Sequence, residues 1–84
     1  MHYVYVLKSK NRKYLYTGCT IDLRKRVKEH NAGEVISTKP YRPLELIYYE
    51  ACLDEKDAYF REKYLKSRLG KNYLRKRLKF WFSK

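Results

Sequence analysis

The sequence predicts one α+β domain, with a small three-stranded antiparallel sheet flanked by three helices. Residues 3–7 and 14–17 alternate their side chains with a period of two, as half-buried strands do. Residues 44–51 form a third such run, and three other segments place apolar residues at helical spacing. The expected order is ββαβαα, and 84 residues leave room for a single domain over residues 1–84.

The first two strands are expected to form a hairpin. The polar stretch at residues 9–12 would be its loop, and pairing Lys8 with Lys13 would place Tyr5 directly opposite Tyr16. Opposite residues of an antiparallel pair share a face, so the two phenol rings would lie side by side. A register shift of one residue would move one ring to the other face.

A short helix is expected after the hairpin, with Thr20 as a suitable N-cap. Leu23, Val27 and His30 are spaced at i, i+4 and i+7 and therefore share one face, with Arg26 at its edge. The helix would end where a glycine can adopt the left-handed conformation.

Residues 31–33 contain this glycine, and residues 34–43 are expected to form a polar loop. The strand at residues 44–51 would then place alternate side chains on opposite faces: Leu44, Leu46 and Tyr48 on one, and Ile47 and Tyr49 on the other.

A second helix is expected to begin at Asp54 and to end at Gly70. It has two apolar sides, which suits a helix between the sheet and a further helix. Glu62 falls on one of these apolar sides, an unusual place for a carboxylate. Apolar residues at i, i+4, i+7 and i+8 then predict a third helix: Leu74, Leu78, Trp81 and Phe82.

The charge balance points to a polyanionic partner. The chain has 21 Lys and Arg against 9 Asp and Glu, a formal net charge of +12, and such a field attracts nucleic acid. Ten tyrosines add surface for stacking on unpaired bases, although tyrosines also pack cores. Composition alone does not separate a nuclease from a nucleic-acid-binding protein without activity.

The two cysteines, Cys19 and Cys52, lie far apart and form no CxxC motif. Adding His2 and His30 reaches four possible zinc ligands, but their spacing fits no zinc pattern. We therefore expect two reduced thiols in a cytoplasmic protein. No apolar run approaches the ~18 residues of a membrane span, and no secretory signal is expected. We expect no small-molecule cofactor, and a protein partner is left open.

The combined motifs resemble those of the GIY-YIG nuclease superfamily over nearly the whole chain. Tyr3-Val4-Tyr5 lies where that family has its first triplet, and Tyr16-Thr17-Gly18 where it has its second. Two residues differ from the family's triplets: Tyr3 replaces the first glycine, and Thr17 replaces the second isoleucine. Arg26 and His30 resemble the family's helix signature, and Glu62 resembles its metal-binding glutamate. The length is closest to the small stand-alone members.

This resemblance implies a GIY-YIG-like fold and a metal-dependent endonuclease that hydrolyses phosphodiester bonds in DNA, with structured or damaged DNA as one candidate substrate. Arg26 would bind the scissile phosphate through its planar guanidinium. Glu62 would bind Mg²⁺ or Mn²⁺, and His30 would shuttle a proton or position its neighbours. Tyr5 and Tyr16 would orient or deprotonate the attacking water. A free phenol with a pKa of ~10 is a poor base at neutral pH, so Arg26 or the metal would have to lower one. The residues leave open which tyrosine acts, and whether DNA or RNA is cut.

Each of these residues also has an ordinary structural interpretation. Glu62, for example, could form a helix-surface pair with Lys66 at i, i+4, worth only ~0.2–0.5 kcal/mol. The alternative function is a non-catalytic nucleic-acid-binding module on the same fold, which binds by charge and aromatic stacking. A third is a membrane-surface protein, since residues 74–82 are basic, amphipathic and aromatic.

Overall fold

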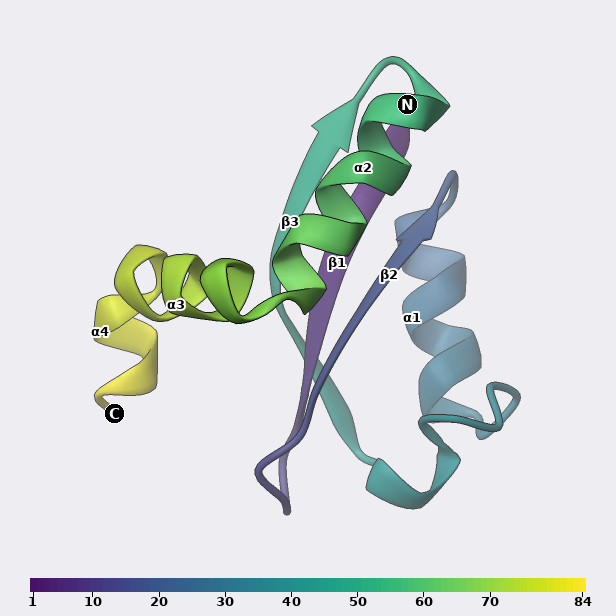
Figure 1. The fold of residues 1–84 in the computed structure, drawn as a ribbon. Coiled ribbons are helices and arrows are strands. Elements are labelled where there is room, and N and C mark those ends of the chain that lie inside the picture. Colours follow the sequence, from purple (N-terminus) through teal and green to yellow (C-terminus); the bar gives the residue numbers. More distant parts are fainter.

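The computed structural model describes residues 1–84. Its core is an antiparallel sheet of order β2-β1-β3, with α1 against one face and α2 against the other (Figure 1). The α+β class and the three-stranded sheet predicted from the sequence are confirmed. The elements are β1 (His2–Ser9), β2 (Leu15–Thr20), α1 (Leu23–Asn31), η1 (Lys39–Tyr41), β3 (Leu44–Cys52), α2 (Glu55–Lys66), α3 (Arg68–Arg77) and α4 (Lys79–Phe82).

The hairpin of β1 and β2 differs in register from the expectation. Lys8 pairs with the residue two positions beyond Lys13, so Tyr16 is a diagonal neighbour of Tyr5 and not its direct partner. The loop is longer than expected because the buried hydroxyl of Ser9 accepts hydrogen bonds from two backbone N–H groups within it. A shift of two residues keeps every side chain on its face, so both tyrosines still face α1.

Because β1 is the central strand, its side chains point alternately to the two faces of the sheet and contribute to two cores. One core lies between the sheet and the helices α2 and α3: Val4, Val6, Ala58, Leu65 and Leu74. The other lies between the sheet and α1: Tyr5, Leu7 and Leu44. Burying one large apolar side chain contributes ~1.5–3 kcal/mol, so β1 provides much of the stability of both layers.

β3 contains a β-bulge that the alternation pattern did not predict. The register with β1 shifts so that Val6 pairs with Tyr48 and Leu7 pairs with Leu46, which leaves Ile47 as the extra residue. Tyr48 and Ile47 therefore pack in the α2 core, and Leu46 packs in the α1 core. The expectation that Tyr48 shares a face with Leu46 is wrong.

The ends of α1 are fixed by side chains. Asp22, and not Thr20, caps the helix, because its carboxylate accepts a backbone hydrogen bond from the first turn. Thr20 instead ends β2. Gly33 follows the helix with a φ of +80°, as expected. The amide of Asn31 donates to Leu44 O (3.0 Å) and accepts from Leu44 N–H (2.8 Å), which attaches the end of α1 to β3.

The junction of α2 and α3 also differs from the expectation. α2 begins after Asp54 as predicted, but it ends at Lys66, and Ser67 caps α3 by accepting a hydrogen bond from Gly70 N–H (3.2 Å). Gly70 does not break a helix. It is buried in the first turn of α3, where a Cβ atom would overlap the backbone of Leu65 at the end of α2.

The single third helix expected over residues 74–82 is divided at Leu78 into α3 and α4. Leu74 and Leu78 pack into the α2 core. In Figure 1, α3 continues beyond the end of α2 and does not cover it, so Phe60 is 79% exposed. The expectation that α2 lies between the sheet and another helix is therefore wrong. None of the helices has the length and apolar character needed to cross a bilayer.

We predict that Gly70→Ala lowers the free energy of unfolding by about 3 kcal/mol, because the new methyl group would push α3 away from α2. In an unconstrained helix the same change is favourable by about 1 kcal/mol. Urea denaturation measures the difference. Lys71→Ala, at the next and exposed position, is the control and should stay within about 0.5 kcal/mol of the wild type. A Gly70→Ala protein as stable as the wild type would contradict this close approach.

Candidate active site

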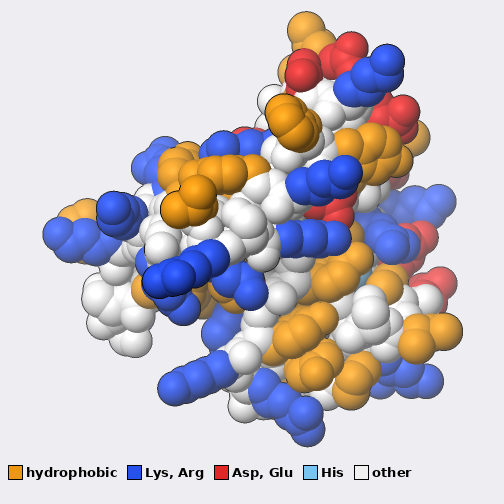
Figure 2. Space-filling view, in the orientation of Figure 1, with side chains coloured by type: hydrophobic (Ala, Val, Ile, Leu, Met, Phe, Trp, Pro, Cys, Tyr) orange, Lys and Arg blue, Asp and Glu red, His pale blue; other side chains and the backbone are white.

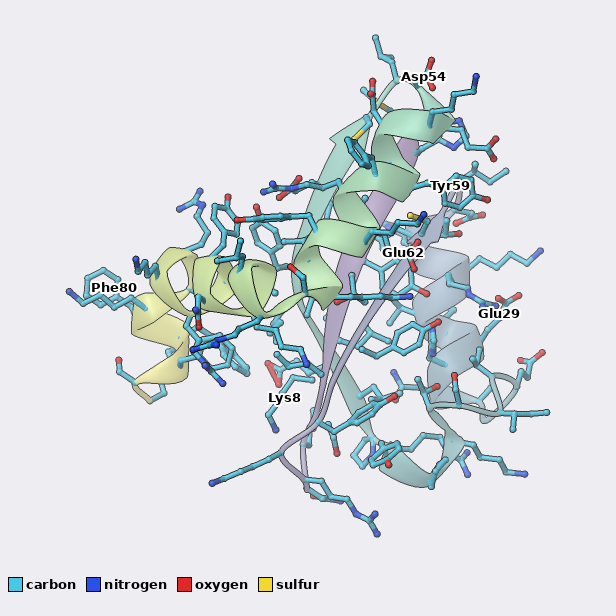
Figure 3. All side chains as sticks on the ribbon, viewed as in Figure 1. Lys8, Glu29, Asp54, Tyr59, Glu62 and Phe80 are labelled. Carbon is cyan, nitrogen blue, oxygen red and sulfur yellow. The ribbon has the colours of Figure 1, made fainter.

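The five residues predicted from the sequence lie together at the β2 edge of the sheet. Tyr5 and Tyr16 come from β1 and β2, Arg26 and His30 come from α1, and Glu62 comes from α2. The Tyr16 ring centroid lies 6.2 Å from that of Tyr5 and 5.0 Å from that of His30. Tyr16, Arg26 and Glu62 are all close enough to influence the pKa of Tyr5. Figure 3 shows Glu62 on the side of α2 toward β2 and α1. The roles assigned to these residues stay predictions.

A buried chain of hydrogen bonds joins Tyr5, His30 and Thr38. The Tyr5 hydroxyl lies 2.8 Å from His30 Nε2, and His30 Nδ1 lies 2.7 Å from Thr38 Oγ1. Tyr5 is 1% exposed, and the other two residues are fully buried. Buried polar atoms are costly without partners, and no buried side-chain nitrogen or oxygen in this protein lacks one.

The direction of these hydrogen bonds follows from the acceptors. The Thr38 hydroxyl donates to Val35 O (3.4 Å), which leaves its oxygen to accept from His30 Nδ1–H. His30 Nε2 then carries no hydrogen and accepts from the Tyr5 O–H. We assign this arrangement because it gives every donor an acceptor. The Tyr5 proton therefore points at His30, and the Tyr5 oxygen can still accept a hydrogen bond, with the Arg26 guanidinium close enough to donate one.

Burial controls the pKa values of this pair. Desolvation raises the pKa of Tyr5 to about 12, and the nearby Arg26 only partly opposes it. Desolvation and the positive charge of Arg26 lower the pKa of His30 to about 4. Both groups are therefore neutral at pH 7. In the free protein, Arg26 therefore does not bring the pKa of Tyr5 below that of a free phenol. The other expected route, in which the metal lowers the pKa of a phenol, stays a prediction.

Gly18 makes room for the Tyr5 ring. It lies directly opposite Tyr5 in the ladder between β1 and β2. A Cβ atom at Gly18 would lie only 2.6 Å from the Tyr5 hydroxyl oxygen and 3.0 Å from Tyr16 Cε2. Any larger residue would therefore move the Tyr5 hydroxyl away from His30. The glycine is needed here for close packing and not for a turn.

Arg26 is positioned by Glu29, whose carboxylate lies 3.1 Å from Arg26 Nη1. The Arg26 side chain is 36% exposed. A guanidinium has five N–H donors, so most of them stay available to a ligand. The planar guanidinium group of Arg26 can bind two phosphate oxygens at once.

Glu62 forms an ion pair with Lys66 (Oε2 to Nζ, 2.7 Å), and its side chain is 17% exposed. No group of three or more His, Cys, Asp or Glu side chains is placed to hold a metal ion. The donor set is thus one hard carboxylate oxygen. It fits Mg²⁺ or Mn²⁺, which are often bound by one carboxylate together with water and substrate phosphate. It does not fit zinc, which takes three or four protein ligands.

Positive charge surrounds the site. Lys and Arg side chains cover much of the face shown in Figure 2, whereas acidic side chains gather at the end of the molecule where α2 begins.

Cys19 and Cys52 are both free thiols and half-buried. Burial and the nearby Glu62 raise the pKa of Cys19 to about 12, so it is not a reactive thiolate.

Comparison with known proteins gives the class to which this site belongs. A model of the GIY-YIG catalytic domain matches residues 1–83. The chain therefore belongs to the GIY-YIG family.

Its relatives include the UPF0213 protein CPE1444 of Clostridium perfringens, which is 43% identical over 67 residues, covering 79% of this chain and 71% of that protein. The UPF0213 protein YazA of Bacillus subtilis is 44% identical over 66 residues, which cover 77% of this chain and 66% of that protein. The match thus spans about two thirds of these relatives. The solution NMR structure of the UPF0213 protein BH0048 from Bacillus halodurans is 34% identical, with a TM-score of 0.53 over 87% of this chain and 80% of that chain.

Thr38 is the residue of the site that sequence analysis missed. It lies in the loop before η1, where no periodicity indicates which side chain turns inward. The role of Gly18 was also missed, because the expected register placed Tyr16 opposite Tyr5. The correct pairing would have pointed to the contact.

We predict that the free energy of unfolding falls as the pH is lowered from about 6.5 to about 4 because of His30. The unfolded chain takes up a proton near the ordinary histidine pKa of 6.5, whereas folded His30 resists protonation until about pH 4. The unfolded state binds more protons in this window, so acid reduces stability.

Urea denaturation of wild type and His30→Gln across this pH range measures the effect. The stability difference between the two proteins should shrink by up to about 3 kcal/mol on acidification. Parallel pH profiles would show that His30 is not held neutral.

Proposed function

We propose that this protein is a divalent-metal-dependent endonuclease that hydrolyses phosphodiester bonds in DNA. The observation that carries the proposal is the meeting of four kinds of group at one edge of the sheet: a guanidinium, two phenols, a histidine bonded to one phenol, and a half-buried carboxylate. Membership of the GIY-YIG family supports a nucleic acid as the substrate. The net charge of +12 adds general attraction to a polyanion.

Arg26 would bind the scissile phosphate. Its side chain is 36% exposed and its guanidinium has free donors, and Glu29 holds it at the site. Negative charge on the phosphate grows as the water attacks, so a preorganised cation is worth more in the transition state than in the bound substrate.

Tyr5 and His30 would form the proton path. The attacking water would give its proton to the Tyr5 oxygen while the Tyr5 proton passes to His30 Nε2, 2.8 Å away. Thr38 would keep its hydrogen bond to His30 Nδ1 during the transfer. The bound phosphate would neutralise Arg26 and so remove one cause of the low His30 pKa. This path assigns the water to Tyr5, and Tyr16 would orient the water and the phosphate.

Glu62 would hold Mg²⁺ or Mn²⁺ through its carboxylate group. When bound, such an ion polarises the phosphate and stabilises the leaving oxygen. Glu62 must first release Lys66, whose ammonium group would then be free to contact a phosphate oxygen.

The alternative is a nucleic-acid-binding module that does not cut. The 2.7 Å ion pair favours it, because Lys66 already occupies the Glu62 carboxylate. In that case charge and aromatic stacking would supply the binding.

Glu62→Gln separates the two functions. We predict that it abolishes cleavage of labelled DNA in Mg²⁺, because the amide keeps the shape but loses the charge that holds the ion. Folding, and DNA binding in chelator, should not change. Glu55→Gln, at the exposed start of the same helix, is the control and should cut normally. Normal cutting by Glu62→Gln would leave Glu62 as a helix ion-pair residue only.

Arg26→Ala and Arg24→Ala form a second matched pair. We predict that Arg26→Ala lowers the single-turnover cleavage rate by about 10²–10³, the usual effect of losing one preorganised contact to developing charge. Arg24 lies about 160° away around α1, at ~100° per residue. Its loss should therefore weaken DNA binding slightly and reduce the slope of log affinity against log salt concentration by about one. Equal, small losses of binding by both variants, with no effect on any rate, would favour the binding module.

A further inference from the structure

A cleft adjoins the candidate site where β2 meets the junction of α2 and α3. Its volume is about 210 Å³. Its apolar floor is formed by Leu15, which is half-buried, and by Leu65 and Leu74, which are each 1% exposed. Tyr16 of β2 and two lysines, Lys66 and Lys71, also line the cleft. Figure 2 shows hydrophobic surface beside basic side chains on this face of the molecule.

Two of these residues also belong to the candidate site. Tyr16 lies within 5.0 Å of His30 between ring centroids, and Lys66 is the ion-pair partner of Glu62. Whatever occupies the cleft therefore lies next to the position of the scissile phosphate.

The chemistry of the cleft suits a nucleotide whose base is not paired. A base offers a flat apolar face to the leucines, and its flanking phosphates offer negative charge to Lys66 and Lys71. The cleft is smaller than the ~300–1,000 Å³ pockets that hold drug-sized ligands, so one ring system is the right scale. A base inside a duplex is stacked on both faces and cannot enter it.

We propose that this cleft binds one unpaired nucleotide next to the scissile phosphate, so that DNA with a bulged or unpaired nucleotide is the preferred substrate. The inference rests on the proposed nuclease function for the identity of the ligand, because that function makes nucleic acid the partner. It adds what the catalytic residues do not specify, namely the local structure of the DNA.

The test compares a duplex that carries one unpaired nucleotide with the matched, fully paired duplex. Binding is measured by fluorescence anisotropy in chelator, and cleavage is measured separately in Mg²⁺. We expect about tenfold tighter binding of the bulged duplex, in line with stacking of a single base on a protein surface, and cutting beside the bulge.

Two pairs of variants locate the effect. Leu15→Phe fills the cleft without a change of charge and should remove the preference while leaving the affinity for paired DNA unchanged. Leu78→Phe, at a half-buried leucine outside the cleft, is its control. Lys71→Gln should weaken binding of the bulged duplex more than that of the paired one, whereas Lys76→Gln, about 140° away on α3 at ~100° per residue, should weaken both equally. The lysines are exposed, so these two variants test the cleft even where Leu15→Phe does not fold.

The outcomes separate the two proposals. A preference for the bulged duplex that Leu15→Phe or Lys71→Gln removes supports the cleft, and if no DNA is then cut, only the nuclease proposal fails. Equal affinity for both duplexes, or a preference that survives both variants, overturns the cleft proposal, while cleavage of paired DNA still decides the nuclease proposal. Failure to bind either duplex overturns both.

Discussion

The hydrogen-bond chain from Tyr5 through His30 to Thr38 connects three parts of the fold: the central strand, α1 and the loop before η1. A buried polar group left without its partner costs about 1–3 kcal/mol, so each member depends on the other two. The chain thereby fixes the position of α1 on the sheet, and with it the position of Arg26. It also requires Gly18 beneath the Tyr5 ring, because any side chain there would displace the hydroxyl.

The burial that holds this chain together also keeps its groups unreactive in the free protein. Tyr5 has a raised pKa and His30 a lowered one, and desolvation is the main cause of both. On the proposed mechanism, a phosphate bound to Arg26 would offset the positive charge that helps to lower the pKa of His30, so that His30 would accept a proton more readily. Reactivity would thus depend on the substrate, which suits a nuclease that must not act on other phosphates.

Strand alternation and helical spacing predicted the fold because they are local signals. The five candidate residues came from the resemblance to the motifs of a family, and their roles stay predictions. The sequence could not set the hairpin register, since a period of two looks the same after a shift of two residues, and the loop around Ser9 decides it. The bulge at Ile47 was hidden because both faces of β3 are apolar. Thr38 was hidden because an inward-turning loop side chain has no periodicity. The sequence predicts that Gly70 ends a helix, whereas in the structure this glycine lets α3 approach the end of α2.

Thr38 holds His30 in one neutral form, whose Nε2 accepts the Tyr5 proton. The most direct test is an NMR measurement of the two ring nitrogens of His30 in ¹⁵N-labelled protein near neutral pH. The account predicts hydrogen on Nδ1, an unprotonated Nε2, and loss of this single form in Thr38→Val. Hydrogen on Nε2 in the wild type, or a charged imidazolium at neutral pH, would contradict it, because Tyr5 would then have no acceptor for its proton.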